Sequence, residues 1–258
     1  MRTRYEAFLN KKSLSAIDPA IYILDIAYDA PRFSMETNAI PGRDGLRVSD
    51  RHAQSTSVTI KFEIHDQDIA RRQDICRRVQ GWAMQGGILT TNDRRGQRLN
   101  VICESLPSID SALRWTKSLS VMLTAYEQPF WEDEQSRRVS ISGASGSASL
   151  YAPGFGALTR VEADVKNNSS STINALTLKA GATTFDFTGL SLAPGGTLRI
   201  GYDENGLLSI RAGEESKMSS RTSASDDDLM IRTGRAETVS VTAGGSVSAV
   251  FHARGLYL

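Results

Sequence analysis

The chain has 258 residues, of which 40% are hydrophobic and 23% are charged, and its formal net charge is +1. These values are typical of a globular protein with one large or two moderate domains, and they exclude a disordered chain. A net charge near zero disfavours dedicated nucleic-acid binding, because such binding requires excess basic residues to neutralise phosphates.

The composition changes near residue 135, which predicts two domains, 1–135 and 136–258. All three tryptophans and both cysteines, Cys76 and Cys103, precede this point, whereas 15 of the 21 glycines follow it. Two cysteines are too few for a disulfide scaffold, so both are predicted to be free and buried. The first residues lack the apolar core of a signal peptide, and no apolar run is long enough to span a bilayer. We therefore expect folding in a cytoplasm and no membrane insertion.

Two strands are predicted early in the chain. Residues 21–27 are rich in β-branched side chains, and residues 57–64 alternate between apolar and polar side chains, as a half-buried antiparallel strand requires. Connections as long as the polar segment between them are uncommon unless they form an arm, a hairpin or a binding loop. Its candidate interface residues are Pro41, Gly42, Arg43, Asp44 and Gly45.

A helix is predicted from about residue 67 to residue 85. Asp66 and Asp68 suit its N-terminus, the glycine pair 86–87 suits its end, and apolar side chains recur on one face at the helical period. Arg72 lies within this apolar stripe. Either its stem packs while its guanidinium reaches water, or the guanidinium pairs with a group across a subunit contact. The second interpretation makes Arg72 a candidate interface residue.

Two more strands are predicted at residues 99–104 and 118–125. Pro129 marks the end of the second strand region, because proline cannot donate a hydrogen bond to a strand ladder. Phe130 and Trp131 follow at the point where the chain leaves the first domain. Two large aromatic side chains there fit either a core plug between the domains or a contact with a neighbouring subunit, since aromatic residues are enriched in interface cores.

Short strands separated by polar and glycine-rich turns predict an antiparallel β-sandwich or jelly roll in the second domain. The predicted strands are residues 159–165, 183–187, 198–202, 207–211, 229–232, 237–242 and 246–252. Asn205 and Gly206 favour a hairpin, because a type I′ turn needs positive φ at both central residues. The glycine- and serine-rich segment 142–149 is predicted to be a flexible start of this domain.

The sequence carries no recognisable catalytic, cofactor or metal motif. Its three histidines form no zinc-binding pattern, and segment 142–149 lacks the lysine and the strand–helix context of a phosphate-binding loop. Carboxylates such as those of residues 226–228 can bind calcium, but here no spaced ligand series surrounds them, which favours a solvated loop. We expect no enzymatic activity, no cofactor and no metal site.

Several features follow one another in a distinctive order along nearly the whole chain. They are the loop 41–45, a strand ending in residues 62–66, a basic helix with a glycine stop, a strand closing on residues 124–131, the segment 225–229 before a turn at Gly234, and the end 251–258. This order resembles the distal tail proteins of long-tailed bacteriophages. The resemblance implies a mainly β protein, with an N-terminal β-sandwich or barrel-like ring domain bearing one α-helix and a galectin-like or jelly-roll C-terminal sandwich.

The resemblance also implies a structural role in the virion. Members of that family form a hexameric ring at the tail tip through the N-terminal domain. Self-association, the tail tube protein and a tail-tip or baseplate hub protein are therefore the implied partners, with the tape measure protein and receptor-binding proteins as further ones. Neither nucleic-acid specificity nor membrane insertion is implied.

Two other functions remain open from the residues alone. A carbohydrate-binding module would stack sugars on exposed aromatic side chains, and the second domain offers Tyr151, Phe155, Tyr202 and Tyr257 but no tryptophan. A cell-wall hydrolase would need two carboxyl groups that face each other across a cleft, and no such pair is recognisable. Glycan binding would support the first, and loss of cell-wall turbidity the second.

Overall fold

The computed structural model describes residues 5–42, 44–109, 118–203 and 206–258. The chain divides into two compact units, one of residues 1–132 with residue 258 and one of residues 133–257. Each unit holds one antiparallel sheet system, and α1 (Ile69–Met84) is the single α-helix of the described residues. The prediction of a mainly β protein with one helix is confirmed. No described helix combines the length and the apolar character that a membrane span requires.

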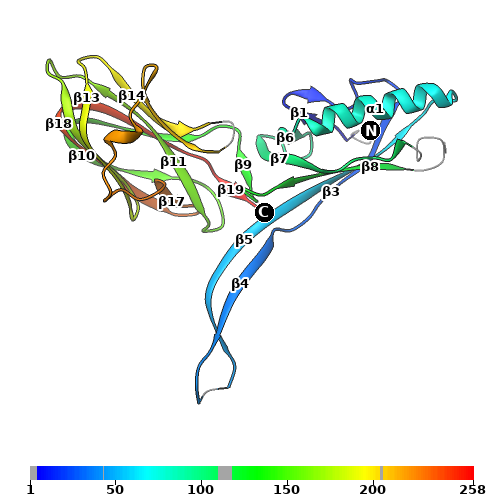
Figure 1. The fold of residues 1–258 in the computed structure, drawn as a ribbon, viewed down its shortest axis with the longest axis horizontal. Coiled ribbons are helices and arrows are strands. Elements are labelled where there is room, and N and C mark those ends of the chain that lie inside the picture. The colour runs from blue at the N-terminus through cyan, green and yellow to red at the C-terminus, as the bar shows by residue number, and fades with distance from the viewer. Residues whose placement is uncertain (1–4, 43, 110–117, 204–205) are drawn as a thin grey trace. The chain divides into compact units, whose positions relative to one another are not determined.

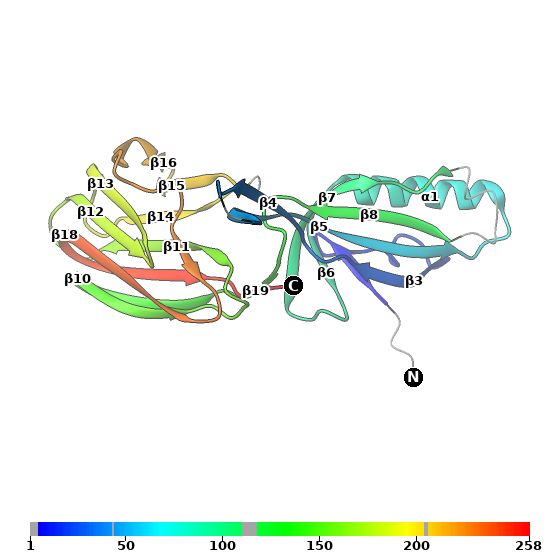
Figure 2. The same cartoon turned by 90° about the horizontal axis from the view of Figure 1, so that it is seen from below.

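The N-terminal unit is built on one sheet with α1 lying over one of its faces (Figures 1 and 2). The sheet has the strand order β2-β1-β6-β7-β8-β5-β3, while β4 pairs with β5 and β9 pairs with β7. Its strands are β1 (Ala7–Leu9), β2 (Lys12–Ser13), β3 (Ile21–Tyr28), β4 (Arg32–Ala39), β5 (Leu46–Ile64), β6 (Gly87–Thr91), β7 (Gln97–Ser105), β8 (Leu119–Ala125) and β9 (Trp131–Asp133).

The alternation predicted for residues 57–64 occupies the second half of β5. Val58, Ile60 and Phe62 are at most 1% exposed, whereas Lys61 is exposed. Apolar side chains on one face of a strand and polar ones on the other follow from the period of 2 in a β-strand. The strand itself begins earlier than predicted, at Leu46, because its first half pairs with β4 outside the sheet.

Both ends of α1 are set by local chemistry. The Asp68 carboxylate accepts a hydrogen bond from the Ala70 amide at 2.9 Å, which satisfies one of the free amides of the first turn. Gly87 follows the helix with φ +104, a conformation that other residues rarely adopt. The Asn10 side chain packs against it, donating to the Gly86 carbonyl at 2.8 Å and accepting from the Ile88 amide at 2.9 Å.

The connection between β2 and β3 is fixed to α1 through a buried carboxylate. Asp18 is 6% exposed, and its side chain lies 2.9 Å from Arg78 and 3.5 Å from Arg71. The hydrogen bond from the Ala20 amide lowers the pKa of Asp18 below its ordinary value, burial opposes this shift, and the two arginines add to it. The ionised form of Asp18 therefore stabilises the N-terminal unit.

The C-terminal unit is a two-layered β structure with the strand order β13-β12-β18-β11-β14-β15-β16. Outside this path, β10 pairs with β18, and β17 pairs with β11. The strands are β10 (Arg137–Tyr151), β11 (Leu158–Asn167), β12 (Ile173–Ala180), β13 (Thr183–Leu192), β14 (Thr197–Tyr202), β15 (Leu208–Ala212), β16 (Glu215–Ser216), β17 (Met230–Arg232), β18 (Ala236–Ala253) and β19 (Leu256–Tyr257). A 3₁₀ turn, η2 (Met218–Ser220), follows β16.

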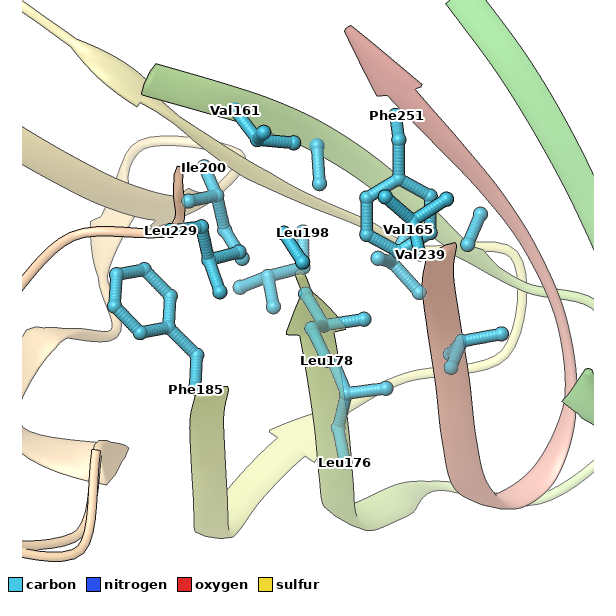
Figure 3. Close-up of a cluster of buried hydrophobic side chains, with 14 of the residues drawn as sticks. Val161, Val165, Leu176, Leu178, Phe185, Leu198, Ile200, Leu229, Val239 and Phe251 are labelled. Carbon is cyan, nitrogen blue, oxygen red and sulfur yellow. The ribbon is translucent and has the colours of Figure 1, made fainter. Parts of the chain in front are cut away.

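The core of the C-terminal unit lies between these strands and is aliphatic with a few aromatic rings (Figure 3). Phe185, Phe187 and Phe251 are fully buried, and the first two rings meet edge to face at 6.3 Å. Leu198 and Ile200 reach the same cluster from β14. Such packing accounts for the strong alternation that the sequence shows in these segments.

Several predictions for this unit were wrong in detail. Segment 142–149, predicted to be flexible, lies inside β10, which pairs with β18 from end to end apart from a bulge at residues 143–145. Small polar side chains diluted the apolar signal there, although Ile141 and Leu150 are buried. The two strands predicted at 237–242 and 246–252 form one strand, β18.

In the N-terminal unit, the prediction that both cysteines are buried was wrong for Cys103, which is only partly buried.

A matched pair of glycine substitutions tests the end of α1. We expect Gly87→Ala to lower the free energy of unfolding by about 2–3 kcal/mol, because the added Cβ would lie 2.3 Å from Asn10 Oδ1 at an unfavourable φ. Gly81→Ala, inside the exposed face of α1 with no atom within 4 Å of the new Cβ, should raise it by about 1 kcal/mol. Urea denaturation of the two variants checks both signs, and equal effects would contradict this account.

The Asp18 carboxylate should make stability fall in acid. Its pKa in the folded protein is lowered, so its contribution is full above the pKa of the unfolded chain, near 3.8, and is lost as the pH falls through the folded value. We expect Asp18→Asn to lower the free energy of unfolding by about 1–3 kcal/mol at pH 7. The variant should also lose less stability between about pH 5 and pH 2 than the wild type does. If the free energy of unfolding of the two proteins changes with pH in the same way, this role of Asp18 is contradicted.

Candidate functional site

The most distinctive feature of the N-terminal unit is an arm, defined here as residues 32–55. It consists of β4, the first half of β5 and the turn between them, and it extends as a two-stranded ribbon away from the sheet of its unit (Figure 1). From Thr56 onward β5 runs within the sheet, next to β8 and then also β3. The prediction that the long connection forms an arm or a hairpin is confirmed.

The register of the arm sorts its side chains onto two faces of opposite character. Residues paired directly across an antiparallel ribbon point to the same side. Thr37 pairs with Val48 and Ala39 with Leu46, while a bulge between the Glu36 and Thr37 pairs keeps the two strands in phase. The apolar face carries Phe33, Met35, Ala39, Leu46, Val48 and Ala53 together with the polar Thr37, and the backbone partner of Met35 is Arg51. The polar face carries Ser34, Glu36, Asn38, Arg47 and His52.

The apolar face is exposed within this chain. Leu46 is 66% exposed, Met35 58%, Val48 51% and Phe33 39%. A two-stranded ribbon is at best marginally stable by itself, and clustered exposed apolar side chains mark contact surfaces. The polar face, which carries charges of both signs at Glu36 and Arg47, would stay in water if the apolar face were covered. The geometry is that of a ribbon that lies flat on a partner.

The predicted loop residues form the tip of the arm. Pro41, Gly42, Asp44 and Gly45 are all exposed, and Arg43 lies outside the described residues. Gly42 and Gly45 have φ of 77° and 97°, so the tip needs glycine at both positions for its backbone. An interface role for these residues remains a prediction.

Arg72 has a local role at the start of α1. It is 4% exposed, and its Nη1 donates to the carbonyl oxygens of Asp66 at 2.7 Å and Gln67 at 3.1 Å. The interpretation in which its guanidinium reaches water is therefore wrong. An interface role for Arg72 remains a prediction.

Phe130 and Trp131 are also buried, at 8% and 2% exposure. Trp131 meets the ring of Tyr28 edge-on at 5.5 Å, and the Arg94 guanidinium lies 4.5 Å from the centre of the Tyr28 ring and 5.0 Å from that of Trp131. Burial, and then the hydrogen bond with Asp93, raise the pKa of Tyr28 above its ordinary value. The two aromatic residues are thus buried within the chain, and an interface role for them remains a prediction.

Four large apolar residues of the arm, Phe33, Met35, Leu46 and Val48, were not predicted from the sequence as interface residues. The signal was present, because each pair is spaced by two residues on either side of the tip. Arginine, glutamate, threonine and asparagine between and beside them gave the segment a polar average. Its amphipathic character appears only when both strands are aligned in register.

The carboxylates of residues 226–228 take part in hydrogen bonds within the loop. Asp226 Oδ2 accepts from the Thr184 amide at 2.7 Å, and Asp228 Oδ1 accepts from the Tyr202 hydroxyl at 2.8 Å. Among the described residues, no group of three or more His, Cys, Asp or Glu side chains is arranged to hold a metal ion. The loop is therefore explained by its structural contacts.

The aromatic residues considered for sugar binding differ in their surroundings. Tyr151 and Phe155 are 51% and 45% exposed. The Tyr202 ring is covered by the Arg160 guanidinium at 4.5 Å, and burial and Asp228 raise the pKa of its hydroxyl. Tyr202 thus has an intramolecular role and does not offer a free stacking face.

Comparison with known proteins connects this architecture to phage tails. No family model and no curated protein matches the sequence. Among solved structures, the Dit protein (gp 19.1) of phage SPP1, a paradigm of the hub adsorption apparatus in phages that infect Gram-positive bacteria, matches with a TM-score of 0.70 at 12% identity. The match covers 99% of this chain and 100% of that one. The chain shares the Dit fold.

Two structures of the phage P2 baseplate in its activated conformation give weaker likenesses. The one with calcium matches with a TM-score of 0.56 at 8% identity, over 99% of this chain and 98% of that one. The one with strontium matches with a TM-score of 0.55 at 8% identity, over 97% of each chain. The predicted resemblance to phage distal tail proteins is confirmed at the level of the fold.

Proposed function

We propose that this chain is a structural protein of a phage tail tip, a hub that joins the tail tube to baseplate and host-adsorption proteins. The observation that carries the proposal is the likeness to SPP1 Dit, which covers both units in one continuous match. A likeness confined to the C-terminal sandwich would have carried little weight, since that architecture serves many functions.

The hub is proposed to be a ring of identical chains, with six copies implied by the sequence resemblance. A closed ring requires two different, complementary patches on each subunit. The arm supplies one of them, because its apolar face is exposed in the single chain and its polar face suits contact with water. A net charge of +1 lets copies approach without strong mutual repulsion.

The two units then have separate tasks. We assign ring formation and contact with the tail tube and tip proteins to residues 1–135, and an outward-facing position to residues 136–258. The tape measure protein and receptor-binding proteins are further proposed partners, and the protein is placed in the virion. This role is structural, and it requires neither a catalytic group nor a cofactor.

Light scattering of the purified chain across a dilution series tests the ring and the arm together. We expect the wild type to give one discrete oligomer mass that persists on dilution. The double variant Leu46→Ser/Val48→Ser should weaken each contact roughly 100-fold, because it removes two apolar side chains that a neighbour would bury. Its mass should fall toward that of the monomer.

The matched control is Asn38→Ser/Arg47→Ser, a cross-strand pair on the polar face of the same arm. It should keep the wild-type mass, and circular dichroism should show both variants folded, since all four side chains are exposed. A wild-type chain that stays monomeric at every concentration contradicts a self-closing ring. If Leu46→Ser/Val48→Ser keeps the oligomer mass of the wild type, the ring proposal stands, but the arm is not the contact between its subunits.

A further inference from the structure

One long strand edge in the C-terminal unit has no partner among the described residues. β10 pairs along its entire length with one side of β18, whose other side is occupied by β12 and then β11 (Figure 2). No other described strand pairs with β10. Its outer edge therefore presents a row of backbone amide and carbonyl groups to solvent.

The same unit closes a comparable edge elsewhere. The outer edge of β13 is covered by the loop of residues 222–226. The Thr222 amide donates to the Asp186 carbonyl at 2.8 Å, and the Asp226 amide donates to the Thr184 carbonyl at 2.9 Å. The Asp226 carboxylate accepts from the Thr184 amide in return, at 2.7 Å. The open edge of β10 is thus not a general property of this fold.

The composition of β10 favours the approach of another strand. Edge strands are usually protected by charged residues, proline, bulges or covering segments. Residues 139–151 contain no charged residue and no proline, and consist mostly of serine, glycine and alanine. The one protective device is the bulge at residues 143–145. Between the buried residues Ile141 and Leu150, only small side chains flank the outer edge of β10.

Two exposed arginines stand at the start of β10, a few residues after the acidic residues 132–134. Arg137 and Arg138 are both exposed, and neither forms an ion pair with an acidic side chain in the described part of the chain. A strand that lies antiparallel to β10 places its C-terminal end beside these two arginines. Antiparallel pairing is the arrangement of every ladder in this sheet and is slightly the more stable kind.

We propose that β10 is a docking edge for an extended segment of another protein. That segment adds a strand antiparallel to β10, is uncharged over most of its length, and has acidic side chains at its C-terminal end to meet Arg137 and Arg138. Backbone hydrogen bonds supply affinity in this mode, and end charges set direction and register. A second copy of β10 fits less well, because antiparallel self-pairing leaves both arginines without an acidic partner.

A synthetic peptide of alternating threonine and valine that ends in two glutamates serves as the probe, and the full-length chain is the target. Hydrogen exchange should show slower exchange of amides within residues 137–151 when this peptide is added. A control peptide with the glutamates at its N-terminal end should bind roughly 3- to 10-fold more weakly, because the exposed ion pairs are lost.

Charge reversal gives the decisive comparison. Arg137→Glu/Arg138→Glu should reverse the preference, so that a peptide ending in two lysines binds better than the one ending in two glutamates. Arg211→Glu, an exposed position on β15, should change neither affinity. Absence of β10 protection with the glutamate-ended peptide, or an unchanged preference in the reversed variant, overturns the proposal. Concentration-dependent protection of β10 without peptide would assign the edge to a second copy and overturn it as well.

This docking edge goes beyond the hub role and does not depend on it. The reversed variant should keep the oligomer mass of the wild type, and Leu46→Ser/Val48→Ser should keep peptide binding. Oligomer mass therefore tests the ring, and peptide binding tests the docking edge, so that either proposal can fail without the other.

Discussion

The N-terminal unit depends on one strand, β5, which belongs both to the exposed arm and to the buried sheet. β5 runs without interruption from Leu46 to Ile64, and its backbone hydrogen bonds join the arm to the sheet. In its second half, alternate side chains are buried beneath α1. In its first half, the same alternation produces an apolar face whose large side chains are 39% to 66% exposed. Because the strand is continuous, the orientation of the arm is determined by the packing of the core.

The sequence was sufficient for those elements in which local pattern and tertiary environment agree. The helix follows its N-cap Asp68 and ends before the glycine pair, as capping chemistry predicts, and β14 pairs with β15 as the predicted hairpin requires, while Asn205 lies outside the described residues. The failures came where a residue's role depends on a distant segment. In the sequence, Arg72 is a charged residue within an apolar stripe. In the structure, its guanidinium donates hydrogen bonds to carbonyl groups of residues that precede the helix. For Phe130 and Trp131 the sequence left a core plug and a subunit contact open, and the packing of Trp131 against the ring of Tyr28 could not be predicted because Tyr28 is far away in sequence.

In the C-terminal unit, β10 is a strand that its local composition does not predict. Between Ile141 and Leu150, β10 has none of the large apolar residues by which strands are recognised, and it is a strand there because it pairs with β18 on both sides of the bulge. Serine and glycine are tolerated there because the strand lies at the border of the unit, where few side chains need to fill a core. Strand formation is therefore imposed on these residues by pairing, which no reading of local composition can reveal.

The two bulges of the arm affect how readily the free chain aggregates. A flat ribbon with an exposed apolar face would stack readily on other copies and nucleate aggregates. Bulges at the Arg32–Phe33 and Glu36–Thr37 steps interrupt the ladder and increase its twist, so two such ribbons cannot align over a long stretch. The charged side chains of the opposite face keep that surface hydrated. The folded chain is thus protected against open-ended stacking, and its apolar face suits a surface shaped to receive a twisted ribbon.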